Sequence, residues 1–439
     1  MPDMLPPEEV TNCSATSYHG KDQAPDIIAD IAAFLDRFLR LAAVPLSVVF
    51  SLTSLAMCGA LLLNGLGIIH ADFGPFWHDF QSFFSAGVAA LKGNGGKIYD
   101  FYWHSEHIKQ VIGPQGVEFG WHYPPQFLLF LGPLALLPVP VAFMLWCLLP
   151  LAVFVWLVYR LIPDWRTALI ATGCPIIIIN TNYAQNGVLS TVFIGLAMLP
   201  FIENKKPSAL STSLLAFKPH MGLVFPVAFA AGRLWSTIWL TAFWLTVQIG
   251  ITALAFGPQI WMDFWGSLTQ SKTILLTEIG AGAHHYVSVF GSVRLLDGPP
   301  ALAYLAQLVS AGLTLYVLWK VWRTDTSRPL KAALLVASIA LTAPYLIHYD
   351  MVVAVLACVL LIRQHPCALW VRRDRLLMAG LWLCTAFNYR LQEGYHIPAG
   401  LICNLLLYYL VHRIIRFEQT ANKGSVVSHS AASGQGSAH

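Results

Sequence analysis

Charged residues are scarce in this sequence. Only 11% of its 439 residues are Asp, Glu, Lys or Arg, whereas a soluble domain averages roughly 25%. The net charge of +4 is small and gives no indication of a nucleic-acid partner. The eight cysteines are dispersed without metal-ligand spacing and read as small core residues. HExxH, CxxC, Walker A and strand-linked GxGxxG motifs are also missing, so metalloprotease, redox and nucleotide-hydrolysing functions have no support.

Apolar residues dominate what is present. Hydrophobic residues make up 56% of the chain, and the mean hydropathy is +0.61. Several apolar runs reach or approach the roughly 20 residues that a helix needs to cross a bilayer. Basic residues cluster at the ends of these runs, as at Lys205-Lys206 and Arg372-Arg373. The sequence therefore predicts an all-α polytopic membrane protein whose basic clusters report its orientation.

The chain divides into a membrane body with a tail at each end. Residues 1–28 are polar, predict a disordered tail and do not resemble a cleavable signal peptide. Residues 27–40 have helical periodicity and predict an interfacial helix that leads into a first span at about 41–68. The transmembrane domain is predicted over 29–417. The Ser- and Gly-rich segment 418–439 predicts a second disordered tail.

Orientation follows from the distribution of Lys and Arg. With Arg37 and Arg40 inside, the other basic clusters also lie inside if the stretch 124–137 crosses only partially. This predicts about twelve crossings with both termini cytoplasmic. Two long polar segments, one after the first span and one at 257–300, then become extracytoplasmic loops. The first is too long for a structureless loop and predicts folded content.

The polar motifs between spans all fall on the outer face in this topology. They are Asp79 with its neighbours, "NTNYAQNG" (180–187), "FKPH" (217–220), "GAHHYVS" (282–288) and "YLIHYD" (345–350). Five clusters from distant parts of the chain thus converge on one side of the membrane. The sequence predicts a functional site there.

Asp79 allows two interpretations. It precedes "FQSFFSAGVAAL", which has helical spacing, and Asp is a favoured N-cap. A carboxylate among aromatic residues at the mouth of a helical bundle can also act as a general base, because a low local dielectric raises its pKa. Position alone favours the cap. Asp100 follows the turn "GNGG" and is predicted to shape the loop.

The other motifs also carry a functional and a structural interpretation. His348 and Asp350 stand where one apolar stretch ends and another begins, and they are either site residues or a polar helix turn. Pro219 predicts a helix break beside Lys218, which suits an anion or is a lysine reaching toward the headgroups. The amides of 180–187 suit sugar hydroxyls or a turn. The pair His284-His285 is a weak signal for phosphate binding.

Five segments in this order carry a family resemblance. They are "HDFQSFFSAGVAALKGNGGKIYD", "HYPPQFLLFLGPLALLP", "NYAQNGVLSTVFIGLAML", "FKPHMGLVFPVAFAAGRLW" and "APYLIHYDMVV". Together, over roughly residues 70 to 365, they resemble the GT-C membrane glycosyltransferases of glycosyltransferase family 87, bacterial enzymes that include polyprenol-phosphate-mannose-dependent mannosyltransferases.

The resemblance implies a GT-C helical bundle that transfers a sugar with inversion. It implies a polyprenyl-phosphate sugar donor, a glycolipid or glycan acceptor, and an active site on the periplasmic face of the bacterial inner membrane in cell-envelope biosynthesis. No metal ion, other cofactor or nucleic acid is expected. Asp79 is expected as the base with His348 beside it. The remaining expected site residues are Lys218, His220, His284 and His285 for the donor phosphate, and His78, Tyr123, Asn182, Gln185, Asn186, Tyr349 and Asp350 for the sugar or acceptor.

Two other functions stay open on the sequence. A transporter or lipid flippase predicts inverted repeats with paired broken helices, whereas the sequence indicates one clear break, at Lys218-Pro219. A non-catalytic subunit of an envelope-assembly complex is the third possibility.

Overall fold

The computed structural model describes residues 27–65, 68, 79–114, 116, 118–272, 280–364 and 371–434. Its α-helices are α1 (Ile27–Gly65), α2 (Phe80–Leu91), α3 (Phe101–Ile112), α4 (Leu128–Leu134), α5 (Val139–Leu161), α6 (Trp165–Thr172), α7 (Pro175–Asn182), α8 (Gly187–Ile202), α9 (Ala209–Leu214), α10 (Pro219–Gly222), α11 (Val224–Ala231), α12 (Trp235–Phe256), α13 (Gln259–Lys272), α14 (Val289–Leu295), α15 (Pro300–Trp322), α16 (Arg328–Thr342), α17 (Val352–Gln364), α18 (Arg372–Tyr395) and α19 (Ala399–Gly434). Short 3₁₀ helices are η1 (Gly95–Tyr99), η2 (Pro125–Phe127), η3 (Leu215–Phe217), η5 (Gly280–His285) and η6 (His348–Met351). The predicted all-α class is confirmed.

Five helices of the described chain are long and apolar enough to cross a membrane. They are the Leu41–Asn64 part of α1, α5, α12, α15 and the Ala399–Ala421 part of α19. Most of the remaining apolar stretches form shorter helices, whereas α18 has 24 residues. Helix α4 has only seven residues, which suits the partial crossing predicted for 124–137. The figure of about twelve crossings and the GT-C arrangement stay predictions.

Two apolar stretches are broken into shorter helices. The stretch 166–181 divides into α6 and α7 at Gly173, where a Cβ would lie 2.5 Å from the backbone oxygen of Ser47 in α1. Only glycine allows α1 to approach so closely. The stretch 207–232 divides at Lys218, whose backbone leaves the helical conformation just before Pro219. The predicted break is confirmed, because proline cannot donate the hydrogen bond that would continue the helix.

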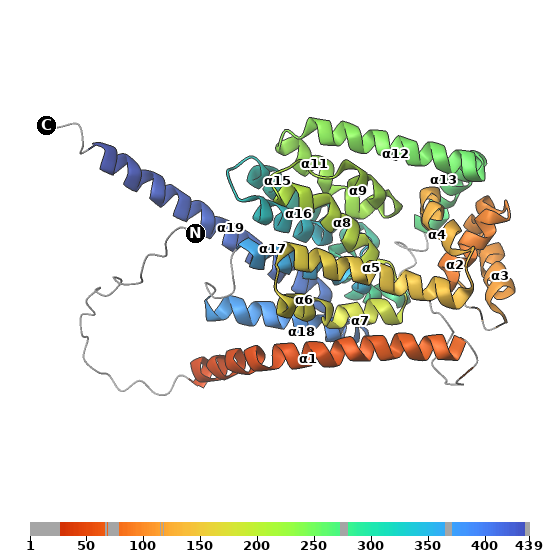
Figure 1. Cartoon of the computed structure of the whole chain (residues 1–439), viewed down its shortest axis with the longest axis horizontal. Helices are drawn as coiled ribbons and strands as arrows, with labels where there is room; N and C mark the ends of the chain where they lie inside the picture. The colour runs from red at the N-terminus through yellow and green to blue at the C-terminus, as the bar shows by residue number, and fades with distance from the viewer. Residues whose placement is uncertain are drawn as a thin grey trace, which may run out of the picture.

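The helices form a layered bundle (Figure 1). Helix α1 lies along one side and contacts α5, α6, α7 and α18, while α12 lies along the other side against α9 and α11. Helices α2, α3, α4 and α13 gather at one end of the bundle. Helix α19 projects beyond the opposite end and runs to Gly434, into the segment predicted as a tail.

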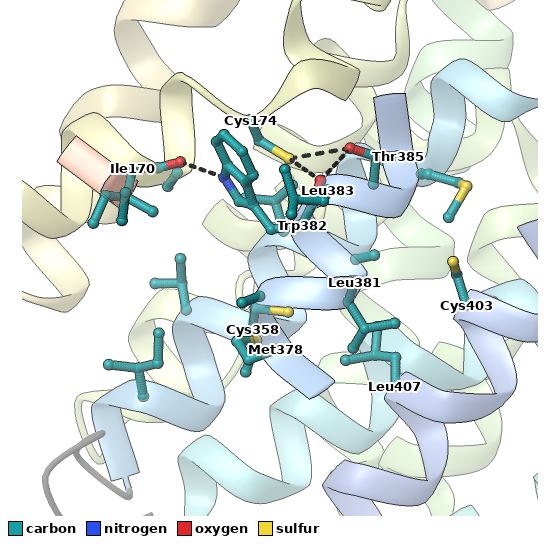
Figure 2. A pocket seen from close by; sticks show the side chains of 18 of the residues that line it. Ile170, Cys174, Cys358, Met378, Leu381, Trp382, Leu383, Thr385, Cys403 and Leu407 are labelled. Carbon is teal, nitrogen blue, oxygen red and sulfur yellow. Dashed lines mark hydrogen bonds between the residues drawn. The ribbon is translucent and has the colours of Figure 1, made fainter. Parts of the chain in front are cut away.

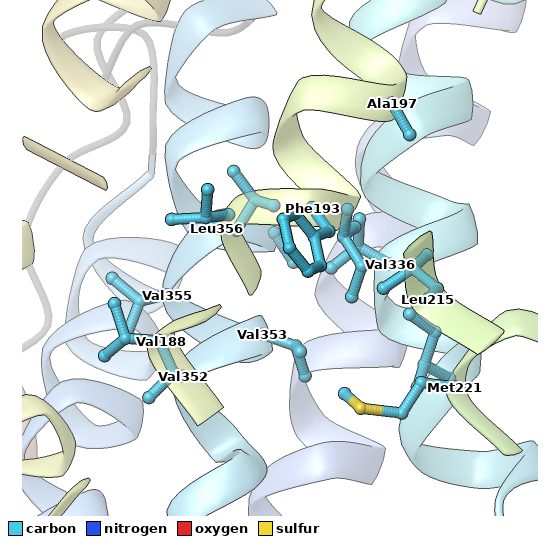
Figure 3. Packing of buried hydrophobic residues seen from close by; sticks show 14 of the residues in the cluster. Val188, Phe193, Ala197, Leu215, Met221, Val336, Val352, Val353, Val355 and Leu356 are labelled. Carbon is cyan, nitrogen blue, oxygen red and sulfur yellow. The ribbon is translucent and has the colours of Figure 1, made fainter. Parts of the chain in front are cut away.

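Helices α8, α16 and α17 form the centre of the bundle. Figure 3 shows Phe193 of α8 between Val336 of α16 and Leu356 of α17, with all three side chains buried. Helix α16 is buried on every side from Ala332 to Thr342, as expected of a helix that is apolar all round. Its alanines allow close helix packing, which stabilises bundles inside a membrane.

These central helices also separate two chemically different ends of the molecule. Helix α8 begins at the polar turn 180–187 and ends beside Glu203, which pairs with Arg160 at 2.5 Å. Arg328 at the start of α16 donates to the backbone oxygens of Phe201 and Lys205, both at 3.1 Å. The basic clusters therefore share one end of the bundle, and the polar motifs lie at the other ends of the same helices.

Candidate active site

A cavity of about 610 Å³ opens at the polar end of the bundle. Six segments that are distant in sequence build its wall: α2, the loop before η2, the turn between α7 and α8, the break before α10, helix α13, and the residues from η5 to η6. Asp79, His122, Tyr123, Tyr183, Gln185, Lys218, His220, His285, Tyr345, His348 and Tyr349 are among its lining residues. The polar motifs that the sequence placed on one face thus surround one space.

Asp79 lies at the start of α2, but its side chain does not cap that helix. The carboxylate instead accepts a hydrogen bond from the Gln185 side-chain amide, and the Asp79 backbone N–H donates to the Tyr183 oxygen at 3.3 Å. Asp79 thus holds the N-cap position of α2 that its place in the sequence predicts, but without the side-chain hydrogen bond of a cap. Burial raises the pKa of Asp79 to about 6, against the opposing effect of the hydrogen bond from Gln185.

Aromatic rings supply that burial. Phe80 and Phe83 follow Asp79 directly, are at most 2% exposed, and pack against Trp146 of α5. The Phe83 ring also contacts Tyr123, with centroids 5.7 Å apart. Asp79 thus stands where an apolar wall meets a polar cavity, and a carboxylate in that setting accepts a proton near neutral pH.

The turn between α7 and α8 fixes the position of Gln185. The Asn180 side-chain amide donates to the Gln185 backbone oxygen at 3.0 Å, and its own oxygen accepts from the Gly187 N–H at 2.8 Å. A Cβ on Gly187 would lie 2.4 Å from the backbone oxygen of Tyr349. Glycine is therefore required where this turn meets η6, and the amide motif is a built turn that presents one of its side chains to Asp79.

Lys218, which lines the cavity, forms a buried ion pair with Asp350. The Lys218 Nζ lies 2.6 Å from the Asp350 Oδ1, and the two side chains are 4% and 1% exposed. Lys218 also lies 5.4 Å from the centre of the Tyr349 ring. Asp350 does not cap η6, since the N-cap of η6 is Ile347. Lys218 faces the cavity with its charge matched by the carboxylate behind it.

His348 belongs to a cluster of rings that the sequence only partly revealed. Its ring lies 5.7 Å from that of His285 and 5.1 Å from that of Tyr389 in α18. Neither ring nitrogen of His348 has a hydrogen-bond partner of regular geometry among the described residues. Burial lowers the pKa values of His348 and His285 to about 4, with each neighbouring histidine adding to the effect. Both rings are therefore neutral at pH 7.

Tyr389 was missed in the sequence. It contacts His284, His285 and His348, with centroid distances of 5.1 to 5.4 Å. The signal that marks it is "NYRLQ" (388–392), a polar run inside an otherwise apolar stretch. Gln392 of the same run donates to the His284 and Tyr286 backbone oxygens at 2.6 and 3.1 Å. Helix α18 thereby holds the histidine segment in place.

The remaining expected residues divide between the cavity and its surroundings. Asn186 does not line the cavity but donates to the Tyr123 hydroxyl at 3.0 Å. His220 lines it and packs edge-on against Tyr345. His284 lies behind His285, and Asn182 lies at the end of α7 outside the lining set. His78 lies outside the described residues.

Comparison with known proteins gives the family. A model of glycosyltransferase family 87 matches residues 121–344, just over half of the chain. The chain belongs to glycosyltransferase family 87. Neither the curated proteins nor the solved structures contain a match.

Membership in family 87 indicates that this membrane protein is a glycosyltransferase. The matched residues include Tyr123, Gln185, Lys218 and His285, whereas Asp79 lies before them and His348 follows them. The cavity is therefore lined by residues inside the matched range and by residues before and after it in the sequence. Within the described residues, no group of three His, Cys, Asp or Glu side chains could hold a metal ion.

Proposed function

We propose that this family 87 enzyme moves a sugar, such as mannose or another hexose or pentose, from a polyprenyl-phosphate donor to a hydroxyl of a glycolipid or polysaccharide. Transfer takes place at the extracytoplasmic face of the bacterial plasma membrane and inverts the anomeric carbon. The observation that carries the proposal is Asp79: a carboxylate with a pKa of about 6, held by Gln185 in a cavity that it shares with Lys218 and His348.

The reaction needs one proton acceptor on the acceptor side. Asp79 takes the proton from the acceptor hydroxyl while that oxygen forms a bond to the anomeric carbon, and the bond from that carbon to the phosphate oxygen breaks. A base works best when its pKa lies near the working pH. The partner of Asp79, the Gln185 amide, is neutral. No cation among the described residues therefore neutralises the carboxylate, and it can accept this proton.

The leaving group is a lipid phosphate, which carries the developing negative charge. Lys218 offers a cation and its Asp350 partner fixes the ammonium group in place. His348 and His285 are neutral at pH 7, so each ring can donate through one N–H group, and neither ring nitrogen of His348 has a regular partner among the described residues. Hydrogen-bond donors fixed in a cavity with little water stabilise such charge strongly.

The sugar and acceptor fit the aromatic part of the wall. Tyr123 and Tyr349 line the cavity, and aromatic side chains in such a wall suit contact with sugar rings. The Asn186 amide orients the Tyr123 hydroxyl. Orientation in the membrane is supported by the basic clusters, which gather at the end of the bundle away from the cavity.

Transfer by the purified protein tests the proposal. Labelled sugar is supplied either as polyprenyl phosphate or as nucleotide sugar, with membrane glycolipid as acceptor, to the wild type, Asp79→Asn and the exposed control Glu106→Gln. We expect transfer only from the lipid donor, and a loss of about 10²- to 10⁴-fold in Asp79→Asn alone, the usual contribution of a general base. Full activity in Asp79→Asn contradicts the assignment of the base, and transfer from the nucleotide sugar contradicts the donor.

A further inference from the structure

A second cavity of about 480 Å³ lies between α1, α6, α17, α18 and α19 (Figure 2). It has no lining residue in common with the candidate active site. Leucine, isoleucine, valine, alanine and methionine side chains form most of its wall, and Trp382 closes one side with its indole N–H bonded to the Ile170 oxygen at 2.9 Å. Most of this wall therefore offers no partner for a sugar or a phosphate, and the charged side chain among its lining residues is Arg375.

The cavity is elongated along the helices. On α18 its lining runs from Arg375 to Thr385, and along the end of η6 and α17 it runs from Met351 to Ile362. Ten or eleven helical residues correspond to about 15 Å. That is half of the roughly 30 Å hydrocarbon core of a bilayer. The cavity therefore has the depth that the chains of one membrane leaflet fill.

Its two ends differ in chemistry. One end lies under η6, where the Asn388 amide nitrogen is 2.8 Å from the Met351 sulfur. The other end reaches Arg375, in the first turn of α18. A neighbouring groove between α18 and α19 contains Arg372 and Arg373 and has Leu381 and Cys403 in common with the cavity.

Positive charge dominates this second end. Three arginines lie within four consecutive positions, and neither the cavity nor the groove contains an acidic residue among its lining side chains. Asp374, the acidic residue between them, is paired with Arg413 of α19. Its charge is therefore already matched. At this end, the apolar cavity opens beside a cluster of arginine side chains.

We propose that this cavity and its groove bind one anionic phospholipid. An acyl chain fills the apolar cavity up to η6, and the headgroup phosphate lies against Arg372, Arg373 and Arg375. Basic pockets between membrane helices bind such headgroups, and anionic lipids are concentrated in the cytoplasmic leaflet. The sugar donor does not fit this arrangement, because its phosphate must reach His348 and the charged mouth lies at the far end of α17 and α18.

Native mass spectrometry of the purified full chain tests the site, with dioleoylphosphatidylglycerol and dioleoylphosphatidylcholine added in turn after delipidation. Ala354→Phe fills the cavity, and Ala242→Phe on exposed α12 is its matched control. Arg375→Gln removes a cation from the mouth, and the exposed Arg390→Gln at the other end of α18 is its control.

We expect one phosphatidylglycerol on the wild type and on both controls, with a higher thermal unfolding temperature when it is bound. Ala354→Phe loses the lipid, and Arg375→Gln weakens binding about fivefold, the effect of one charge near a membrane surface. Equal binding of phosphatidylcholine, or retention of phosphatidylglycerol in Ala354→Phe, overturns the proposal. Polyprenyl phosphate that binds here in competition with phosphatidylglycerol overturns it as well.

Discussion

Two acidic side chains belong to the candidate active site, Asp79 in its lining and Asp350 behind Lys218, and they have different partners. Asp79 has a neutral amide, Gln185, as its partner. Asp350 has a cation, Lys218, 2.6 Å away. Both lie beside aromatic rings, since Phe80 follows Asp79 and Tyr349 precedes Asp350. The two carboxylates therefore differ in the charge of their partner, a neutral amide for Asp79 and a cation for Asp350.

A neutral partner leaves the Asp79 carboxylate able to exchange its proton, whereas the Asp350 carboxylate is bonded to the Lys218 ammonium group. The Asp79 wall can therefore accept a proton during a reaction. The Lys218–Asp350 pair places two opposite charges in contact, and Lys218 of the pair lines the cavity. A glycosyl transfer from a lipid phosphate needs both kinds of group: a base for the acceptor hydroxyl and a cation for the leaving phosphate.

The largest expected effect comes from breaking the ion pair. Asp350→Leu leaves the Lys218 ammonium buried without a counter-charge, which costs about 3 to 5 kcal/mol of folding stability. Thermal unfolding of the purified protein in detergent measures this loss. Lys218→Met combined with Asp350→Leu should regain most of it, and Asp79→Asn should change stability little. An Asp350→Leu protein as stable as the wild type would show that the pair is not buried as described.

The next effect concerns the turn that holds Gln185. Asn180→Ala removes the donor to the Gln185 backbone oxygen and leaves the Gly187 N–H without its acceptor. Loss of buried partners costs about 1 to 3 kcal/mol. Transfer activity should fall together with stability, because Gln185 is displaced from Asp79. Unchanged kcat/KM in a destabilised Asn180→Ala protein would separate the turn from the chemistry.

The smallest expected effect is on stability, and it comes from substituting Asp100, which lies in the same polar segment as Asp79. Asp100 caps α3, and its side chain accepts from the Trp103 N–H at 2.8 Å. Asp100→Ala should therefore cost about 1 kcal/mol of stability, the usual value of an N-cap, with kcat/KM unchanged. Thermal unfolding and transfer assays should show that Asp100→Ala loses stability and keeps its activity, whereas Asp79→Asn loses activity and keeps its stability. A stability loss in Asp79→Asn and not in Asp100→Ala would reverse the assignment of cap and base.

Much of this arrangement follows from the sequence. Hydropathy is sufficient for the all-helical membrane class, and Pro219 predicts the break beside Lys218. The positive-inside rule brings the polar motifs to one side, and the structure gathers members of all five around one cavity. The loop-shaping role of Asp100 is confirmed as an N-cap.

Contacts between residues that are distant in the sequence could not be predicted. Asp79 has the position of a cap, and only the turn from α7 to α8 supplies the Gln185 amide that engages it instead. Asp350 pairs with a lysine 132 positions away. Tyr389 reaches the histidines because α18 packs beside η5 and η6. Each of these contacts depends on how helices are placed, which local patterns do not encode.

The pH dependence of transfer tests the central claim, that Asp79 is the base, most directly. A base must be deprotonated to act, so kcat/KM of the wild type should rise with pH and level off above about 6, the pKa of Asp79. Gln185→Leu removes the hydrogen bond that lowers this pKa, so its rise should move to higher pH and its activity should recover there. His348, with a pKa of about 4, contributes no further change between pH 5 and 8. A profile that is identical in the wild type and Gln185→Leu, or that persists in Asp79→Asn, would contradict the account.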